Sequence, residues 1–350
     1  MTVTHNEYDR GSRPVISVYN LRKRFGQEKG FFAPLGRYVH AVNGVSFSID
    51  RNEAYGLVGE SGCGKTATAR LLVRMYEADE GEILFRGHDK IIQDYVQDVR
   101  QLKGKDFKRY RERVKYVFQD PARSLNPRMT IYEALTSAFR WSTQKRDQAS
   151  LREEAASILE EVGLSAADLE RRPAEFPRGQ RQMISIARGL MMKPDLLICD
   201  EVVSALDVSM QVHILNLLQD LHSRRKSSGM EISFLFIAGD LKAASYFCDR
   251  IGVMYHGEIV EEAPAAVLWK SRLHPYTDLL FSSAQNTARN EEAPPSGHPQ
   301  AEAKKADPES LRLTGGCAFA SRCPYAEDAC CREKPPLAEA EDDHFVRCWR

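Results

Sequence analysis

The chain has 350 residues, enough for one large domain and a smaller appendage. Lys plus Arg and Asp plus Glu both number 49, so the zero formal charge implies no long-range attraction to nucleic acid or to an acidic membrane. No run approaches the roughly 18 apolar residues that cross a bilayer, and the polar start lacks the apolar core of a signal peptide, so we expect the chain to stay inside the cell.

Two antiparallel strands are predicted near the N-terminus, because apolar residues alternate over 15–19 and 45–49. A loop containing glycine and aromatic residues joins them. An aromatic ring ahead of a phosphate-binding loop can stack on adenine, and Phe25 is the first candidate, with Tyr38 as the second. The alternative is that either ring serves packing alone.

Residues 56–66, GLVGESGCGKT, form a short apolar run followed by the pattern G-x-x-x-x-G-K and a serine or threonine. The glycines permit backbone conformations closed to residues with a Cβ, so successive N–H groups can turn inward around a phosphate chain. Lys65 would reach the β- and γ-phosphates, and Thr66 would give its hydroxyl to Mg²⁺. The alternative is a glycine-rich turn without a ligand. The predicted binding residues here are Gly59, Glu60, Ser61, Gly62, Cys63, Gly64, Lys65, Thr66 and Thr68.

Two later strands are followed by polar residues suited to Mg²⁺ and water. A β-branched and aromatic run from residue 114 stops at Pro121, which places Gln119 at a strand end, although a lone glutamine is ordinarily a surface residue. Residues 196–199 are apolar, as in a buried parallel strand, and Asp200 and Glu201 follow at its carboxyl end. Asp200 can hold Mg²⁺ and Glu201 can polarise the attacking water, so Gln119 and Glu201 are the predicted catalytic residues.

The remaining elements follow in order. Helical periodicity covers 147–162 and 180–192, and a strand is predicted over 232–237. Residues 251–255 and 258–261, joined through Gly257, predict a hairpin that closes the core, and 264–283 are predicted to form short helices. Residues 284–310 are rich in Pro, Ala and charge with little to bury, which predicts a linker.

Five of the eight cysteines lie between Cys317 and Cys348, a crowding that favours a metal site over disulfides in a reducing compartment. Cys317, Cys323, Cys330 and Cys348 provide four thiols, suited to an iron–sulfur cluster or to Zn²⁺. Reduced thiols without a metal are the third interpretation.

Taken in order, these motifs resemble those of ABC-transporter ATPase subunits. The matching strings are GESGCGKT, FQDP around Gln119, GQRQ at 179–182, LLICDE at 196–201 and SALD at 204–207. Two more, SLNPRMT at 124–130 and HPYT at 274–277, resemble the ATPase subunits of oligopeptide and dipeptide importers, a group that includes nickel and opine systems. The likeness covers most of the chain, leaving out the N-terminal tail and the linker.

The resemblance implies an α/β fold of the P-loop NTPase class, with a RecA-like core, an antiparallel β subdomain and a helical insertion. The ABC ATPase domain would span 1–262, with the helical subdomain at about 120–193, the HPYT helical extension at 263–283, the linker at 284–310 and a small cysteine-containing extension at 311–350.

The same resemblance assigns the ligands. It implies ATP and Mg²⁺ as cofactors, with Phe25 stacked on adenine, Gln119 as the Q-loop glutamine, and Thr66, Gln119 and Asp200 around Mg²⁺. Asp200 and Glu201 would be the Walker B pair, and Gly179 and Gln180 would belong to the signature that contacts a nucleotide. For the four cysteines it implies a 4Fe–4S cluster, with Zn²⁺ as the alternative.

The sequence departs from the family at two places near the γ-phosphate. Where the family has Leu-Ser-Gly-Gly-Gln, residues 176–180 are FPRGQ, so Pro177 and Arg178 replace a serine hydroxyl and a glycine. Where the family has Ser-His-Asp after a strand, the chain has AGD, and Gly239 stands in place of the switch histidine. Removing one preorganised donor costs about 3 kcal/mol, roughly a hundredfold in rate.

The resemblance therefore implies an energy-coupling ATPase subunit of a binding-protein-dependent importer for peptides or peptide-like solutes, on the cytoplasmic face of the membrane. Its partners would be two membrane-spanning permease subunits, a solute-binding protein and a second ATPase subunit. The two different ATPase subunits would form a heterodimer, in which the signature departure and the missing histidine fall in different nucleotide sites. One alternative is a nucleotide-binding subunit with a structural or regulatory role. The other is a non-transport ABC protein acting on nucleic acid, which the lack of a basic arm disfavours.

Overall fold

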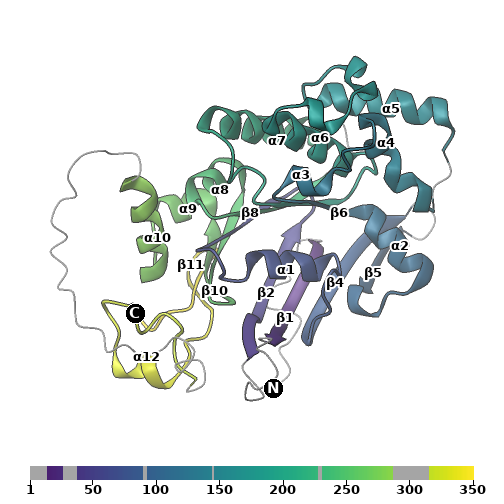
Figure 1. The fold of residues 1–350 in the computed structure, drawn as a ribbon. Helices are drawn as coiled ribbons and strands as arrows, with labels where there is room; N and C mark the ends of the chain where they lie inside the picture. Colours follow the sequence, from purple (N-terminus) through teal and green to yellow (C-terminus); the bar gives the residue numbers. More distant parts are fainter. Residues whose placement is uncertain (1–13, 27–37, 90–92, 144–145, 228–230, 287–314) are drawn as a thin grey trace, which may run out of the picture.

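The computed structural model describes residues 14–26, 38–89, 93–143, 146–227, 231–286 and 315–350, and its strands form two sheets (Figure 1). The smaller sheet is antiparallel, in the order β2-β1-β4-β5. In that order its strands are Tyr38–Asp50, Pro14–Gly26, Glu80–Asp89 and Gln93–Asp98.

The larger sheet has the order β11-β12-β10-β9-β3-β8-β7-β6. In that order its strands are Ala338–Glu341, His344–Val346, Glu258–Pro264, Arg250–Tyr255, Ala54–Val58, Ser233–Ala238, Leu196–Asp200 and Val114–Val117. Strands β6, β7, β8, β3 and β9 are parallel, whereas β10, β12 and β11 are added antiparallel at one edge. The parallel part is buried on both faces, as its continuous apolar strands predict.

Helices α1 to α10 form three groups, and α12 lies apart from them in the C-terminal extension. Helices α3 to α7 gather at one end of the molecule, and α1 and α2 lie by the antiparallel sheet. Helices α8 to α10 lie on the side that carries the C-terminal extension (Figure 1). Their bounds are α1 Lys65–Leu72, α2 Gly104–Arg113, α3 Pro121–Ser124, α4 Ile131–Thr136, α5 Gln148–Glu161, α6 Arg178–Leu190, α7 Val208–Ser227, α8 Leu241–Phe247, α9 Ala265–Lys270, α10 Pro275–Asn286 and α12 Asp328–Arg332. None of the helices in the described ranges is both long enough and apolar enough to cross a bilayer.

Successive residues of a strand point to opposite faces, so the central strands supply two cores. In β7, Leu197 and Cys199 belong to the core shared with α6, α7 and α8. Leu196 and Ile198 belong instead to the core shared with α1 and the antiparallel sheet. The strand is fully buried between these layers, which holds its carboxyl end in place.

The predicted α/β P-loop fold with an antiparallel subdomain is confirmed. Strands β1 and β2 pair antiparallel, and β9 and β10 form the predicted hairpin, with Gly257 at φ +86° in its turn. Helix α6 begins at Arg178, two residues before the predicted start, because Pro177 has no N–H to satisfy and its φ of −57° suits the residue ahead of a helix. Helix α10 continues to Asn286, past the predicted end at 283, and the rest of the predicted linker, 287–310, lies outside the described residues.

The C-terminal extension adds two strands to the core sheet. Strand β12 pairs with β10, and the Nε2 atom of His344 lies 2.7 Å from the Oε1 atom of Glu261, with both side chains buried. The Glu261 carboxylate also accepts the backbone N–H groups of Leu273 and His274 at 2.7 and 3.0 Å. The described part of the extension is therefore docked on the core sheet.

Candidate nucleotide-binding site

The predicted site residues follow the carboxyl ends of neighbouring parallel strands. Strand β3 leads into the phosphate loop, 59–64, while β6 leads to Gln119, β7 to Glu201 and β8 to Gly239. Parallel strands end at the same edge of a sheet, which is where open α/β sheets bind ligands. Val58 and Ala238 are partners in the register, so Gly239 follows β8 beside the start of the loop.

Glycine is required at two positions of the phosphate loop. Gly59 has φ +154°, and a Cβ there would lie 2.1 Å from the carbonyl oxygen of Met254. Gly64 has φ +112°, and its Cβ would lie 2.1 Å from the carbonyl oxygen of Ala41. The loop can therefore pass this close to the neighbouring backbone only because these residues have no side chain.

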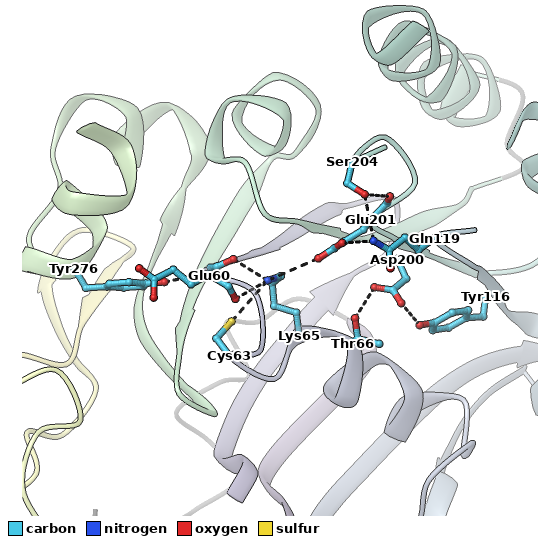
Figure 2. A network of polar contacts seen from close by, with 11 residues as sticks. Glu60, Cys63, Lys65, Thr66, Tyr116, Gln119, Asp200, Glu201, Ser204 and Tyr276 are labelled. Atoms are coloured by element: carbon cyan, nitrogen blue, oxygen red, sulfur yellow. Dashed lines mark hydrogen bonds and ion pairs between the residues drawn. The ribbon is translucent and has the colours of Figure 1, made fainter. Parts of the chain in front are cut away.

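Lys65, the first residue of α1, folds back over the loop (Figure 2). Its Nζ atom donates to the carbonyl oxygens of Gly59 and Glu60 at 2.7 and 3.0 Å, and lies 4.0 Å from the Oε1 atom of Glu201. An ammonium group at the start of a helix, beside a glycine-rich loop, forms a binding site for anions such as phosphate.

Asp200 lies between two hydroxyl groups, and its side chain is buried (Figure 2). Its Oδ1 atom accepts the Thr66 hydroxyl at 2.9 Å, and its Oδ2 atom accepts the Tyr116 hydroxyl at 2.5 Å. Burial, followed by the nearby charge of Asp200, raises the pKa of Tyr116, so this phenol keeps its proton and remains a donor. Hydroxyl and carboxylate oxygens suit Mg²⁺, so Thr66 and Asp200 fit the predicted metal role.

Glu201 and Gln119 meet across the ends of β7 and β6 (Figure 2). The Gln119 Nε2 atom donates to the Glu201 Oε2 atom at 2.7 Å, and the Ser204 hydroxyl donates to the Glu201 carbonyl at 3.0 Å. Glu201 has φ +48°, a left-handed conformation that is costly for a residue with a side chain and typical of functional sites. A cavity of about 230 Å³ opens beside this pair and is lined by Arg70, Phe118, Gln119, Asp120, Arg123, Ser124 and Asp200. A larger one of about 520 Å³ contains no predicted site residue.

The structure shows the contacts of two other residues, Thr68 and Phe25, that are predicted to bind the nucleotide. The Thr68 side chain is fully buried and its hydroxyl donates to the Gly64 carbonyl at 3.0 Å, so it supports the loop from inside α1. Phe25, at the end of β1, is partly buried and makes an edge contact with Tyr76 at 5.1 Å between ring centroids, whereas Tyr38 is 55% exposed. The connecting loop 27–37 lies outside the described residues.

The structure does not bring the signature residues to the phosphate loop of their own chain. Gly179 and Gln180 lie in the first turn of α6, within the helical group of Figure 1. A Cβ on Gly179 would lie 2.5 Å from the side chain of Met210 in α7. Pro177 precedes the helix without a side-chain hydrogen bond to its end, and Arg178 is exposed.

The geometry does not support the predicted metal site of the extension. Cys317, Cys323, Cys330 and Cys348 line one cavity of about 280 Å³, and burial raises the pKa of Cys317 to about 11. A zinc ion requires its sulfur ligands about 2.3 Å from one point. Across the described ranges, no three His, Cys, Asp or Glu side chains are grouped closely enough to hold a metal ion. A single ion such as Zn²⁺ therefore has no site in the described ranges, and nothing in them supports the 4Fe–4S cluster.

Sequence comparison identifies relatives over nearly the whole chain. Residues 42–204 match the ABC transporter family, and residues 260–330 match the oligopeptide/dipeptide transporter C-terminal region. The oligopeptide transport ATP-binding protein AppF of Bacillus subtilis is 36% identical over 342 residues, covering 95% of this chain and 96% of that protein. The probable peptide ABC transporter ATP-binding protein y4tS of Sinorhizobium fredii is 38% identical over 343 residues, covering 96% and 90%.

Solved structures agree on the fold. The ATP-binding cassette MJ0796, in a dimeric post-hydrolysis state bound to ADP and Pi, has a TM-score of 0.58 and 22% identity, covering 71% of this chain and 98% of that one. The ADP conformation of the cassette MJ1267 has a TM-score of 0.59 and 20% identity, covering 77% and 99%. With the spacing of the phosphate-loop residues and the sequence relatives, these findings lead to one assignment: the chain belongs to the ATP-binding subunits of oligopeptide and peptide ABC transporters, which are ATPases.

Proposed function

We propose that this chain is an ATP-hydrolysing subunit of a peptide importer and works as one half of an unequal pair of ATPase subunits. The observation that carries the first part is the assembly of Lys65, Thr66, Asp200, Glu201 and Gln119 at one sheet edge. Relatives named as oligopeptide transport and peptide import ATP-binding proteins support the transport role and a peptide or peptide-like solute.

The residues divide the chemistry of hydrolysis among them. Lys65 and the loop N–H groups would hold the β- and γ-phosphates, and Thr66, Asp200 and Gln119 would hold Mg²⁺, which neutralises phosphate charge when bound. Glu201 would polarise the water that attacks the γ-phosphorus and accept its proton. The hydrogen bond from Gln119 orients the Glu201 carboxylate for that role.

The two departures from the family support the unequal pair. Each nucleotide in an ABC dimer is expected to meet the phosphate loop and switch residue of one subunit and the signature of the other. A homodimer would combine Gly239 with Pro177 and Arg178 in both sites, and two losses of about 3 kcal/mol each would leave almost no turnover. A partner with intact motifs would separate the defects, leaving one in each site. The same departures favour, as a second candidate, a subunit that mainly holds nucleotide.

The proposed complex also contains two membrane-spanning permease subunits and an extracytoplasmic solute-binding protein, with this chain peripheral on the cytoplasmic face. The test is purification of the tagged chain from its own cells in detergent, followed by native mass spectrometry. We expect one copy of this chain, one copy of a different ATPase subunit and two permease subunits. Two copies of this chain with no second ATPase would contradict the heterodimer.

The sequence predicts a 4Fe–4S cluster or Zn²⁺ in the extension, and the metal content of the purified protein tests this prediction. Anaerobically purified protein with a 4Fe–4S cluster would be brown and contain about four irons per chain. Colourless protein with one zinc would favour the alternative ligand set. Protein with neither metal would agree with the geometry of the four thiols.

A further inference from the structure

Glu60, the residue after Gly59 in the phosphate loop, forms hydrogen bonds with two residues from the C-terminal part of the chain. Its backbone N–H donates to the Tyr276 hydroxyl at 2.9 Å, as Figure 2 shows. Its carboxylate accepts both terminal nitrogens of Arg322, each at 2.9 Å. Tyr276 belongs to the HPYT string at the start of α10, and Arg322 belongs to the cysteine-containing extension.

A buried aromatic cluster holds both of these residues in place. Tyr255 at the end of β9, Tyr276 and Phe319 are each no more than 1% exposed. The ring centroid of Tyr255 lies 4.5 Å from that of Tyr276 and 5.3 Å from that of Phe319. The Arg322 guanidinium lies 5.7 Å from the rings of Tyr255 and Phe319. Because its side chain is already ordered against the rings, Arg322 loses less conformational entropy in pairing with Glu60.

Glu60 also connects this cluster to the phosphate-binding lysine. The Lys65 Nζ atom donates to the carbonyl oxygen of Glu60 at 3.0 Å, next to its bond with Gly59. The peptide unit that helps to place Lys65 is therefore part of the residue that Tyr276 and Arg322 hold. Hydrogen bonding to Arg322 is the main favourable cause that lowers the pKa of Glu60, which keeps this carboxylate charged and paired.

We propose that Tyr276 and Arg322 are positioning residues that hold the phosphate loop in its nucleotide-binding geometry through Glu60. ATP affinity then depends on docking of the C-terminal extension, although neither residue is itself expected to touch the nucleotide. The side chains of Arg322 and Glu60 are 40% and 43% exposed, so water screens their ion pair. Its contribution to ATP binding is therefore no larger than that of a well-oriented ion pair on the protein surface. Its loss should weaken ATP binding about threefold to fivefold.

The test measures binding of a non-hydrolysable ATP analogue with Mg²⁺ to the full chain by calorimetry. We expect Arg322→Ala and Glu60→Gln each to weaken binding by this factor, and the double variant to bind no more weakly than either single one, because both remove the same contact. Arg322→Lys should recover part of the affinity. The matched control is Arg332→Ala, which removes an exposed pair with Asp328 in the same extension and should leave affinity unchanged.

Tyr276→Phe tests the second contact, because it removes the hydroxyl and keeps the ring. We expect a loss of affinity here that Tyr246→Phe, a change on the exposed face of α8, does not produce. Wild-type affinity in Arg322→Ala, an equal loss in Arg332→Ala, or multiplied losses in the double variant would each overturn the proposal. If Arg322→Ala fails to fold, Arg322→Gln decides the question, since it keeps most of the side chain and removes the charge that pairs with Glu60.

Discussion

Restoring a histidine at Gly239 should accelerate ATP hydrolysis by the purified chain. No heavy atom outside residues 238–240 lies within 4 Å of the place where a Cβ would be, and Gly239 is not among the described residues with positive φ, so a side chain can be attached there without backbone strain. The residue follows β8 beside the phosphate loop, at the same sheet edge as Glu201. One preorganised donor to the transition state stabilises it by about 3 kcal/mol, which corresponds to about a hundredfold in rate.

The purified chain can pair only with itself, so the gain should apply to both sites of any dimer. We expect steady-state phosphate release to rise about a hundredfold in Gly239→His. Gly239→Ala is the matched control, because it adds the Cβ without the imidazole and should keep the wild-type rate. A variant that also carries Pro177→Ser and Arg178→Gly should be faster still and shows that the assay registers active dimers. If that variant is active while Gly239→His and Gly239→Ala hydrolyse ATP equally slowly, the reasoning about the switch position is wrong.

Two further predictions concern binding and acid stability. Lys65→Ala should abolish ATP binding in calorimetry, because the ammonium that bridges the Gly59 and Glu60 carbonyls is lost, and an unchanged affinity would refute the phosphate-loop assignment. Burial lowers the pKa of His274 from 6.5 to about 4, with Glu261 partly offsetting this, so the folded chain keeps the ring neutral while the unfolded chain takes up the proton. The contribution of this group to the free energy of unfolding should therefore be constant above about pH 6.5 and fall by on the order of 3 kcal/mol toward pH 4. Denaturant titrations of His274→Asn should show a weaker dependence of stability on pH over this range. An unaltered dependence would contradict the prediction.

The sequence predicts the residues of the site that are close along the chain or that directly follow predicted strands. Gly59, Lys65 and Thr66 are close along the chain, so their spacing alone indicates a phosphate loop. Asp200 and Gln119 are far apart in sequence, but both follow apolar strands, and the rule for parallel sheets places them at one edge. Their contacts with Thr66 and Glu201 agree with that expectation.

Tertiary packing determines the contacts that sequence analysis missed. Tyr276 and Arg322 reach Glu60 from 216 and 262 residues away, and no periodicity relates positions that far apart. Tyr116 bonds to Asp200 from a strand whose aromatic residues also suit a buried core, so its pattern did not distinguish the two roles. Strands β11 and β12 have four and three residues, too few for alternation to indicate a strand. Thr68 is predicted to bind the nucleotide from its position near the loop, and in the structure its hydroxyl donates to the Gly64 carbonyl.

The most direct test of the unequal pair is the turnover of the wild-type chain purified alone, at saturating Mg-ATP and over a range of protein concentrations. The account predicts ATP binding with phosphate release near the background set by Glu201→Gln, because every site of a self-pair carries both the Gly239 and the Pro177–Arg178 departures. Brisk hydrolysis by the chain alone, abolished by Glu201→Gln, would contradict it.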